Sequence, residues 1–326
     1  MQIERRSLYN SLRMNWLLDP SMGVEAWQVD DYRTLPIQTL FSRLLEKEIT
    51  FDKSGFIAFA ELLDTPEEMT DALLSDSEFD NKVQDEVYLL VFELWRRLVP
   101  EKPCLTVFCD ELDYQIHSYD FGKLTNLEPL QDALANLQVV LDENADKGVD
   151  KAAIFESVSA NCANDIESFL YDFIAEQIDN GNYSYASELL EGFGDYVQDV
   201  KWFNFLKARL LVFTDQESAN KSIRDIVKKA ASDSDLEFNL EVLAFLTQAG
   251  EKDVFLSLLK KSCPLLELEE DFQDLLAICS EYYHRLDADH EEQAIQKMLN
   301  QRLQKMSSQP ISSSDPDLVN LLKIAK

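Results

Sequence analysis

Apolar residues recur every three to four positions along most of this chain, which is the spacing of an amphipathic α-helix. Turn signals such as Asp19-Pro20 and Gly55 interrupt the pattern at intervals. The pattern predicts two short helices within residues 1–34 and a helical hairpin within residues 35–63. Residues 87–99 are apolar on nearly every side, which is typical of a helix at the centre of a bundle.

Two further helices are predicted over residues 104–121 and 127–145. Gly122 separates them, and Gly148 is the next helix stop signal. Residues 1–148 are therefore predicted to form an N-terminal helical bundle.

A regular repeat follows the predicted bundle. Its markers recur at intervals of 34, 35 and 34 residues, and they are Phe169, Phe203, Phe238 and Phe272. Each marker lies in an apolar stretch that is followed by a break and a second amphipathic segment. The second segments occupy residues 185–193, 219–227, 254–262 and 293–301. Two helices per unit at a fixed period are the signature of a helical-hairpin solenoid, predicted here over residues 149–306.

One unit of this repeat, DNGNYSYASELLEGF, resembles the tetratricopeptide repeat (TPR) family. In that motif a glycine closes the first helix, an aromatic residue follows two positions later, and a small residue lets the helices approach. Gly181, Tyr183 and Ala186 occupy these places. The other units carry Ala219, Val254 and Ala294 at the small-residue position. Val254 departs from the motif, and the family's usual Trp, first-helix Gly and terminal Pro are missing.

The resemblance covers about residues 167–306 and sets the predicted architecture. It implies an all-α protein in which the N-terminal bundle is followed by a right-handed superhelix of TPR-like helical hairpins. Such arrays bind a partner peptide or helix on a groove. A generic α-solenoid is the alternative architecture. Residues 307–326 are predicted to be a flexible Ser/Pro-rich tail, whose apolar end could dock on its own solenoid, on a second copy or on another protein.

The charge balance restricts the partners that this chain can bind. Sixty-one acidic residues against 30 basic ones give a net charge of -31, which repels nucleic acid and anionic lipid surfaces. No stretch of about 18 apolar residues is present, so membrane insertion is not expected. Excess acid can simply keep a large helical surface soluble, or it can attract a basic protein partner or cations. Five scattered cysteines without a CxxC motif favour a reducing, cytoplasmic location.

The sequence shows no motif for catalysis or for a cofactor. GxSxG, phosphate-binding and dinucleotide-binding glycine patterns are absent. His284 and His290 are six residues apart, which on a helix places them about 240° apart rather than on one face as a metal pair requires. His117 lies among aromatic residues and is interpreted as a packing or surface residue. We therefore predict no enzyme activity, no catalytic, cofactor-binding or metal-binding residues and no cofactor.

Residues 50–61, TFDKSGFIAFAE, are similar to an EF-hand calcium loop between two helices. The matching positions hold Asp52, Ser54, Gly55, Ile57 and Glu61. The first position holds Thr50 and the ninth holds Ala58, so two expected ligands are lost. The other interpretation is a turn between two helices, with Asp52 or Ser54 capping the second helix.

Two functional hypotheses follow from the sequence. The first is a non-catalytic interaction scaffold, adaptor or chaperone that binds another protein through basic or amphipathic segments of that partner. Its exposed groove candidates are Glu176, Asn204, Lys207, Glu241 and Gln273. The alternative is a carboxylate-based metal-dependent enzyme or calcium-responsive sensor in the N-terminal half. The oligomeric state is not indicated by the sequence.

Overall fold

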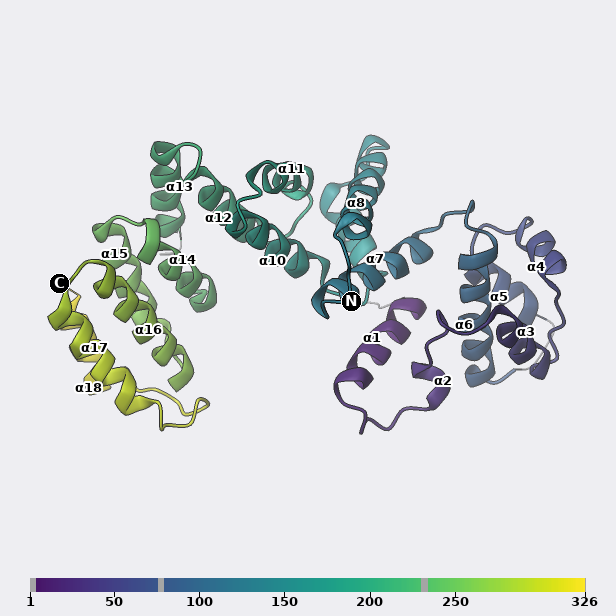
Figure 1. The fold of residues 1–326 in the computed structure, drawn as a ribbon, viewed down its shortest axis with the longest axis horizontal. Helices are drawn as coiled ribbons and strands as arrows, with labels where there is room; N and C mark the ends of the chain where they lie inside the picture. Colours follow the sequence, from purple (N-terminus) through teal and green to yellow (C-terminus); the bar gives the residue numbers. More distant parts are fainter. Residues whose placement is uncertain (1–3, 76–78, 230–233, 326) are drawn as a thin grey trace. The chain divides into compact units, whose positions relative to one another are not determined.

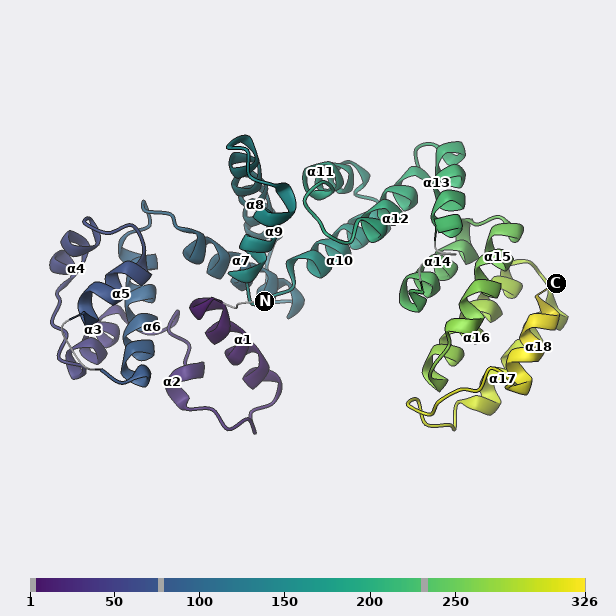
Figure 2. The ribbon, with the colours of Figure 1, turned by 180° about the vertical axis from the view of Figure 1, so that it is seen from behind.

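The computed structural model describes residues 4–75, 79–229 and 234–325. The predicted all-α class is confirmed, since these residues form eighteen α-helices and one short 3-10 helix, with no β-strand among them (Figure 1, Figure 2). The chain divides into two compact units. The first runs to Leu170 and includes Asp195–Gln198, and the second comprises Tyr171–Gly194 and the chain from Asp199 onward.

The first unit is built from nine helices and the first turn of a tenth. They are α1 (Arg5–Leu18), α2 (Ala26–Val29), α3 (Ile37–Glu46), α4 (Lys53–Ala60), α5 (Pro66–Leu74), α6 (Asn81–Leu98), α7 (Leu105–Asp120), α8 (Glu128–Asp146), α9 (Lys151–Ala160) and the start of α10 (Ile166–Asp179). The sequence analysis predicted α1 to α4 and α6 to α8 as separate helices, but not α9. Residue 148 lies in the loop between α8 and α9, and α9 packs on α8, so this unit extends beyond the predicted boundary.

Helix α6 is the centre of the first unit, as its apolar sequence predicted. Every side chain from Val87 to Trp95 is buried, and α3, α4 and α5 pack around the helix. Phe56 of α4 is fully buried and meets Phe41 and Phe51 edge to face. Such aromatic pairs add about 0.5–1.5 kcal/mol beyond the area they bury.

Aspartates begin many of the helices. Their carboxylates accept hydrogen bonds from backbone amides in the first turn, at Asp52, Asp80, Asp150, Asp165, Asp215, Asp235 and Asp315. A cap of this kind contributes about 1 kcal/mol, because the first amides of a helix have no partner within the helix. Part of the acid excess therefore has a local structural role.

The second unit contains three pairs of consecutive helices that pack against each other. Its helices are the rest of α10, α11 (Tyr183–Phe193), α12 (Val200–Leu211), α13 (Gln216–Lys229), α14 (Leu236–Ala249), α15 (Lys252–Ser262), the 3-10 turn η1 (Cys263–Leu265), α16 (Glu269–Arg285), α17 (Asp289–Arg302) and α18 (Pro316–Ile324). α12 pairs with α13, α14 with α15, and α16 with α17. Gly181 adopts φ +78° in the turn before α11, a conformation that favours glycine.

Aromatic residues join the first helices of successive pairs. Trp202 of α12 meets Tyr171 of α10 and Phe238 of α14 edge to face, each at 5.0 Å between ring centroids. α14 packs directly on α16, and α13 packs on α15. All four repeat phenylalanines are buried, at Phe169, Phe203, Phe238 and Phe272. The sequence period therefore reflects one buried aromatic position near the start of each first helix.

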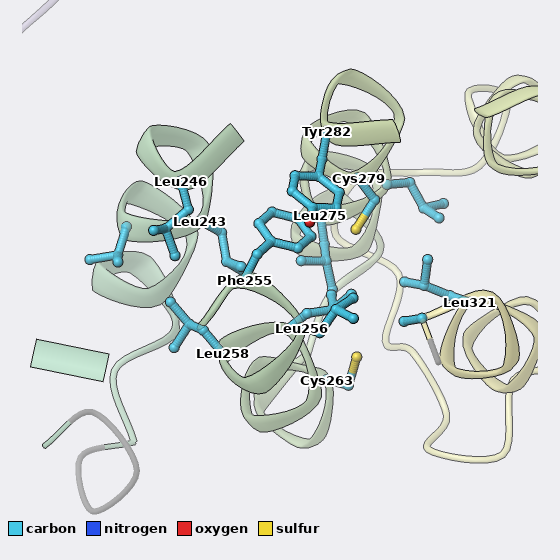
Figure 3. Packing of buried hydrophobic residues seen from close by; sticks show 14 of the residues in the cluster. Leu243, Leu246, Phe255, Leu256, Leu258, Cys263, Leu275, Cys279, Tyr282 and Leu321 are labelled. Atoms are coloured by element: carbon cyan, nitrogen blue, oxygen red, sulfur yellow. The ribbon is translucent and has the colours of Figure 1, made fainter. Parts of the chain in front are cut away.

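A continuous apolar core links α14 to the C-terminal helix. Phe255 of α15 stacks on Tyr282 of α16 with ring centroids 3.7 Å apart. Figure 3 shows Leu321 of α18 pointing toward the same cluster, where it is fully buried. Burying a leucine side chain contributes about 1.5–3 kcal/mol. The last helix therefore closes the core of this unit.

The prediction of a flexible tail is wrong for its described residues. The amides of Glu269 and Glu270, at the start of α16, donate to the carbonyls of Gln309 and Ser307. Beyond this contact, α18 buries Leu318, Leu321 and Ala325, which recur at helical spacing on one face. The Ser/Pro-rich composition hid this docking, because the polar residues serve as turn and caps for a short amphipathic helix.

Arg302 holds the tail in place. Its guanidinium donates two hydrogen bonds to Glu269, at 2.7 and 2.6 Å, and further bonds to Asp315 and Asp317 at 2.9 Å. Arg302 and Glu269 are 2% and 1% exposed. Because both charges are removed from water, each depends on the other for compensation.

None of the described helices is long and apolar enough to cross a membrane.

Replacing Arg302 by methionine is expected to lower the free energy of unfolding by about 3 kcal/mol, since Glu269 would be left buried without its main partner. The matched Arg285→Met change removes an exposed ion pair with Glu281 and should cost less than about 1 kcal/mol. Urea unfolding followed by circular dichroism measures both. Hydrogen exchange should also accelerate across residues 307–325 in the first variant alone. Equal stability of the two variants would contradict this role.

Candidate functional site

A groove runs along the α12–α13 pair in the second unit. It has a volume of about 610 Å³. Its lining comprises Val200, Lys201, Asn204, Lys207 and Leu211 of α12, Ser222, Asp225, Ile226 and Lys229 of α13, and Phe238 of α14. Positions 200, 204, 207 and 211 lie on one face of α12, and positions 222, 226 and 229 lie on one face of α13. The groove is therefore formed by two adjacent helix faces.

The dimensions of this groove suit a helical or extended segment. Along α12 the lining residues extend from Val200 to Leu211, a separation of eleven residues. At 1.5 Å per residue this is about 16 Å, or about three turns of an α-helix. The apolar contribution comes from Val200, which is 49% exposed, and from the half-buried Leu211 and Ile226. An apolar strip of this length is the kind of surface that receives an amphipathic helix.

Charged side chains of both signs line the groove. Its described lining residues include three lysines and the carboxylate of Asp225, and two of these lysines, Lys201 and Lys229, have interaction partners within the protein. Lys201 pairs with Asp235 at 2.6 Å, and its ammonium lies 5.6 Å from the ring centroid of Phe238. Lys207 is exposed and makes no hydrogen bond or ion pair with the described residues. Its ammonium is therefore available to a ligand in the groove.

The predicted groove residues fall in different surroundings. Asn204 and Lys207 line the groove as predicted, whereas the other three do not. Glu241 lies 3.7 Å from Arg209, and the amide of Gln273 donates to the carbonyl of Arg302. Glu176 accepts a long hydrogen bond from Asn180. The residues of α13 were missed because the sequence argument considered only the first helix of each pair.

Buried carboxylates of α7 form the second polar cluster. Asp110 accepts hydrogen bonds from Arg6 at 2.7 Å, from Arg33 at 2.6 Å and from Asn10 at 3.0 Å. Burial alone would raise the pKa of Asp110, but the charges of Arg6 and Arg33 outweigh it and lower this pKa to about 2. The carboxylate thereby ties α1 and the segment after α2 to α7.

Asp113, one turn further along α7, has a different set of partners. It accepts hydrogen bonds from the backbone amides of Ala163 and Asn164 at 2.8–3.0 Å, and another from the side chain of Asn164. Burial raises its pKa to about 6, although these donors favour the charged form. His117 follows on the same helix, beside a cavity of about 60 Å³ that Asp110 and Asp113 also line. These carboxylates therefore hold the fold together around a space that admits only very small molecules.

The calcium-like segment is a capped helix. Residues 53–60 form α4, and the Asp52 carboxylate accepts a hydrogen bond from the amide of Gly55 at 2.7 Å. The residues expected to surround a cation thus follow a helical path, so their side chains diverge. Glu61 is exposed. Among the residues that the structure describes, no three His, Cys, Asp or Glu side chains are grouped to hold a metal ion.

Comparisons with known proteins add no functional assignment. No protein-family model matches this sequence, and no similar protein was found among curated sequences or solved structures. The interpretation of the groove therefore depends on its own residues.

Replacing Asp52 by alanine is expected to destabilise the protein by about 1 kcal/mol, because the amide of Gly55 loses its acceptor. The loss should be the same with calcium and with EDTA, and calcium should not shift the unfolding temperature of the unmodified protein. Differential scanning calorimetry tests both statements, with Ser54→Ala as the matched control. A rise of several degrees with calcium that disappears in the Asp52→Ala protein would show a metal site instead.

Asp110 is expected to make stability depend on pH. Its folded pKa of about 2 lies below its ordinary value of 3.8, so its contribution is complete above pH 4 and is lost as the pH falls toward 2. The contribution is about 2 kcal/mol at pH 7 and about half of that at pH 3. The difference in unfolding free energy between the wild type and Asp110→Asn should therefore shrink over this range. A constant difference would contradict the assignment; Asp31→Asn, which removes an exposed ion pair, is the control.

Proposed function

We propose that this protein is a non-catalytic interaction scaffold whose α12–α13 groove binds a helical or extended segment of another protein. The observation that carries the proposal is the groove itself, about 16 Å long by the rise per residue, whose lining includes the exposed Val200 and the half-buried Leu211 and Ile226 beside polar and charged residues. Grooves with anchors at helical spacing receive amphipathic helices. An adaptor or chaperone role would use the same surface.

The repeated pairs support a TPR-like superhelix as the framework for this groove. The support comes from the period of about 34 residues, the pairing of α12–α13, α14–α15 and α16–α17, and the packing of α14 on α16. In such arrays each pair contacts its neighbours and leaves one helix surface open to ligands. The groove on α12–α13 is one such surface.

The buried carboxylates support the non-catalytic part of the proposal. Asp110 is bound by two guanidinium groups, and Asp113 caps two backbone amides. A general acid or base must have access to the proton that it transfers. Both groups are committed to structural partners, so neither of these two carboxylates is free to serve as a general acid or base.

Photo-cross-linking in the native cell tests the proposal. A photoreactive amino acid in place of Asn204 should join the protein to one defined segment of a partner, identified by mass spectrometry of the cross-linked peptide. The same probe at Lys228, an exposed position of α13 outside the groove lining, is the matched control. Adding Ile226→Ser should reduce the adduct at least fivefold, whereas Lys221→Ser should leave it unchanged. Identical adducts from positions 204 and 228 would contradict binding in the groove.

A further inference from the structure

We infer that the surface of α16 and α17 beneath α18 is a second helix-binding site, which α18 occupies in this structure. A helix of another protein with the same residue pattern enters it when α18 leaves. The site is separate from the α12–α13 groove and does not depend on the function proposed for that groove. Because α18 is itself seated there, its contacts show which side chains the surface accepts.

Helix α18 lies on this surface along one face only. Leu318, Leu321 and Ala325 are buried in the apolar core of the second unit, whereas Asn320 and Lys323 are exposed. Figure 3 shows Leu321 pointing from α18 toward the side chains of α16. The central helix α6, by contrast, is buried on all sides along its middle. Helix α18 therefore has the form of an amphipathic helix bound in a groove.

Polar contacts select the start of the seated helix. One guanidinium nitrogen of Arg302, at the end of α17, donates to Asp315 and to Asp317, each at 2.9 Å. The other two nitrogens of this guanidinium bind Glu269 of α16. The pattern that fits the site is therefore two aspartates in the first turn of a helix. Apolar residues follow three, six and ten positions after the first aspartate.

A short segment of serines joins α18 to the rest of the chain. The amide of Ile311 donates to the carbonyl of Glu267 at 2.9 Å, and the exposed residues 312–314 follow. The hydrogen bonds described for these serines join them to one another and to Asp315. A helix of nine residues is not stable in water by itself, so α18 depends on its contacts with this surface. It can thus unfold locally while the preceding contacts persist.

The tether makes α18 a competitor of any other helix. A short linker holds its ligand at an effective concentration in the millimolar range. The affinity measured for a separate helix is then reduced by the small fraction of molecules in which α18 is released. Weakening the contacts of α18 should therefore strengthen the binding of a separate helix. A helix that serves only as a permanent part of the core would not be replaced in this way.

A fluorescent peptide with the sequence of residues 312–326 tests this inference on the full-length protein. Leu321→Ser in the protein should raise affinity for the unmodified peptide by about tenfold or more, because the tethered helix is weakened. Asn320→Ser, on the exposed face of α18, is the matched control and should bind no better than the wild type. A peptide with both Asp315 and Asp317 changed to asparagine should bind about fivefold more weakly, since Arg302 loses its charged partners. Fluorescence anisotropy measures each affinity.

The results that would overturn the inference are specific. Equal affinity of the peptide for Leu321→Ser and for the wild type would show that the surface accepts no separate helix. Light scattering of a mixture of these two proteins provides a second check. A mixed dimer would assign the site to α18 of a second copy and would overturn the inference of another protein.

A second form of the experiment applies if circular dichroism shows that Leu321→Ser does not fold. A protease recognition sequence replaces residues 312–314 in the otherwise wild-type chain, which is cleaved after folding. Labelled peptide in large excess should then replace the original α18, as measured by native mass spectrometry. Retention of the original helix, or unfolding of the protein on cleavage, would overturn the inference.

Discussion

The second unit depends on each helix pair covering the apolar surface that the preceding pair leaves open. A hairpin of two amphipathic helices cannot bury all of its apolar residues by itself, so a stack of them needs a cover at its end. α18 supplies this cover at the C-terminus through Leu318 and Leu321. Arg302 then fixes that cover, because its partners Glu269 and Asp315 belong to the last pair and to the start of α18. The ion pairs of Arg302 thereby hold α18 over the apolar end of the stack.

The sequence predicted the parts of this fold that depend on local periodicity. The four repeat phenylalanines marked the first helix of each pair, because a large aromatic residue recurs where these helices are buried. The sequence left docking of the tail's apolar end on its own solenoid as one of three alternatives and did not decide among them. The tail's fixation by Arg302 and Glu269 joins residues 33 positions apart in sequence, and a buried ion pair leaves no pattern in the sequence around either member. Polar composition was mistaken for flexibility, although Asp315 caps a helix there.

The candidate groove was predictable only in part, because its exposed surface depends on packing between helices that leaves no local pattern in the sequence. Asn204 and Lys207 stood out as polar residues on a helix with an otherwise apolar sequence. Val200 and Ile226 did not, because a half-exposed apolar residue and a core residue look alike in a one-dimensional pattern. Their difference lies in whether a neighbouring helix covers them, which is a property of the packing. The calcium-like segment shows the converse case, since a matching residue pattern proved to be a capped helix around Asp52.

The charge of the chain has more than one structural meaning, and this changes how a partner should be inferred from it. Seven aspartates cap helices, and Asp110 and Asp113 are buried among specific donors. These carboxylates serve the fold and indicate nothing about a ligand. Close contacts are governed by charges within a few ångströms, because salt screens more distant ones.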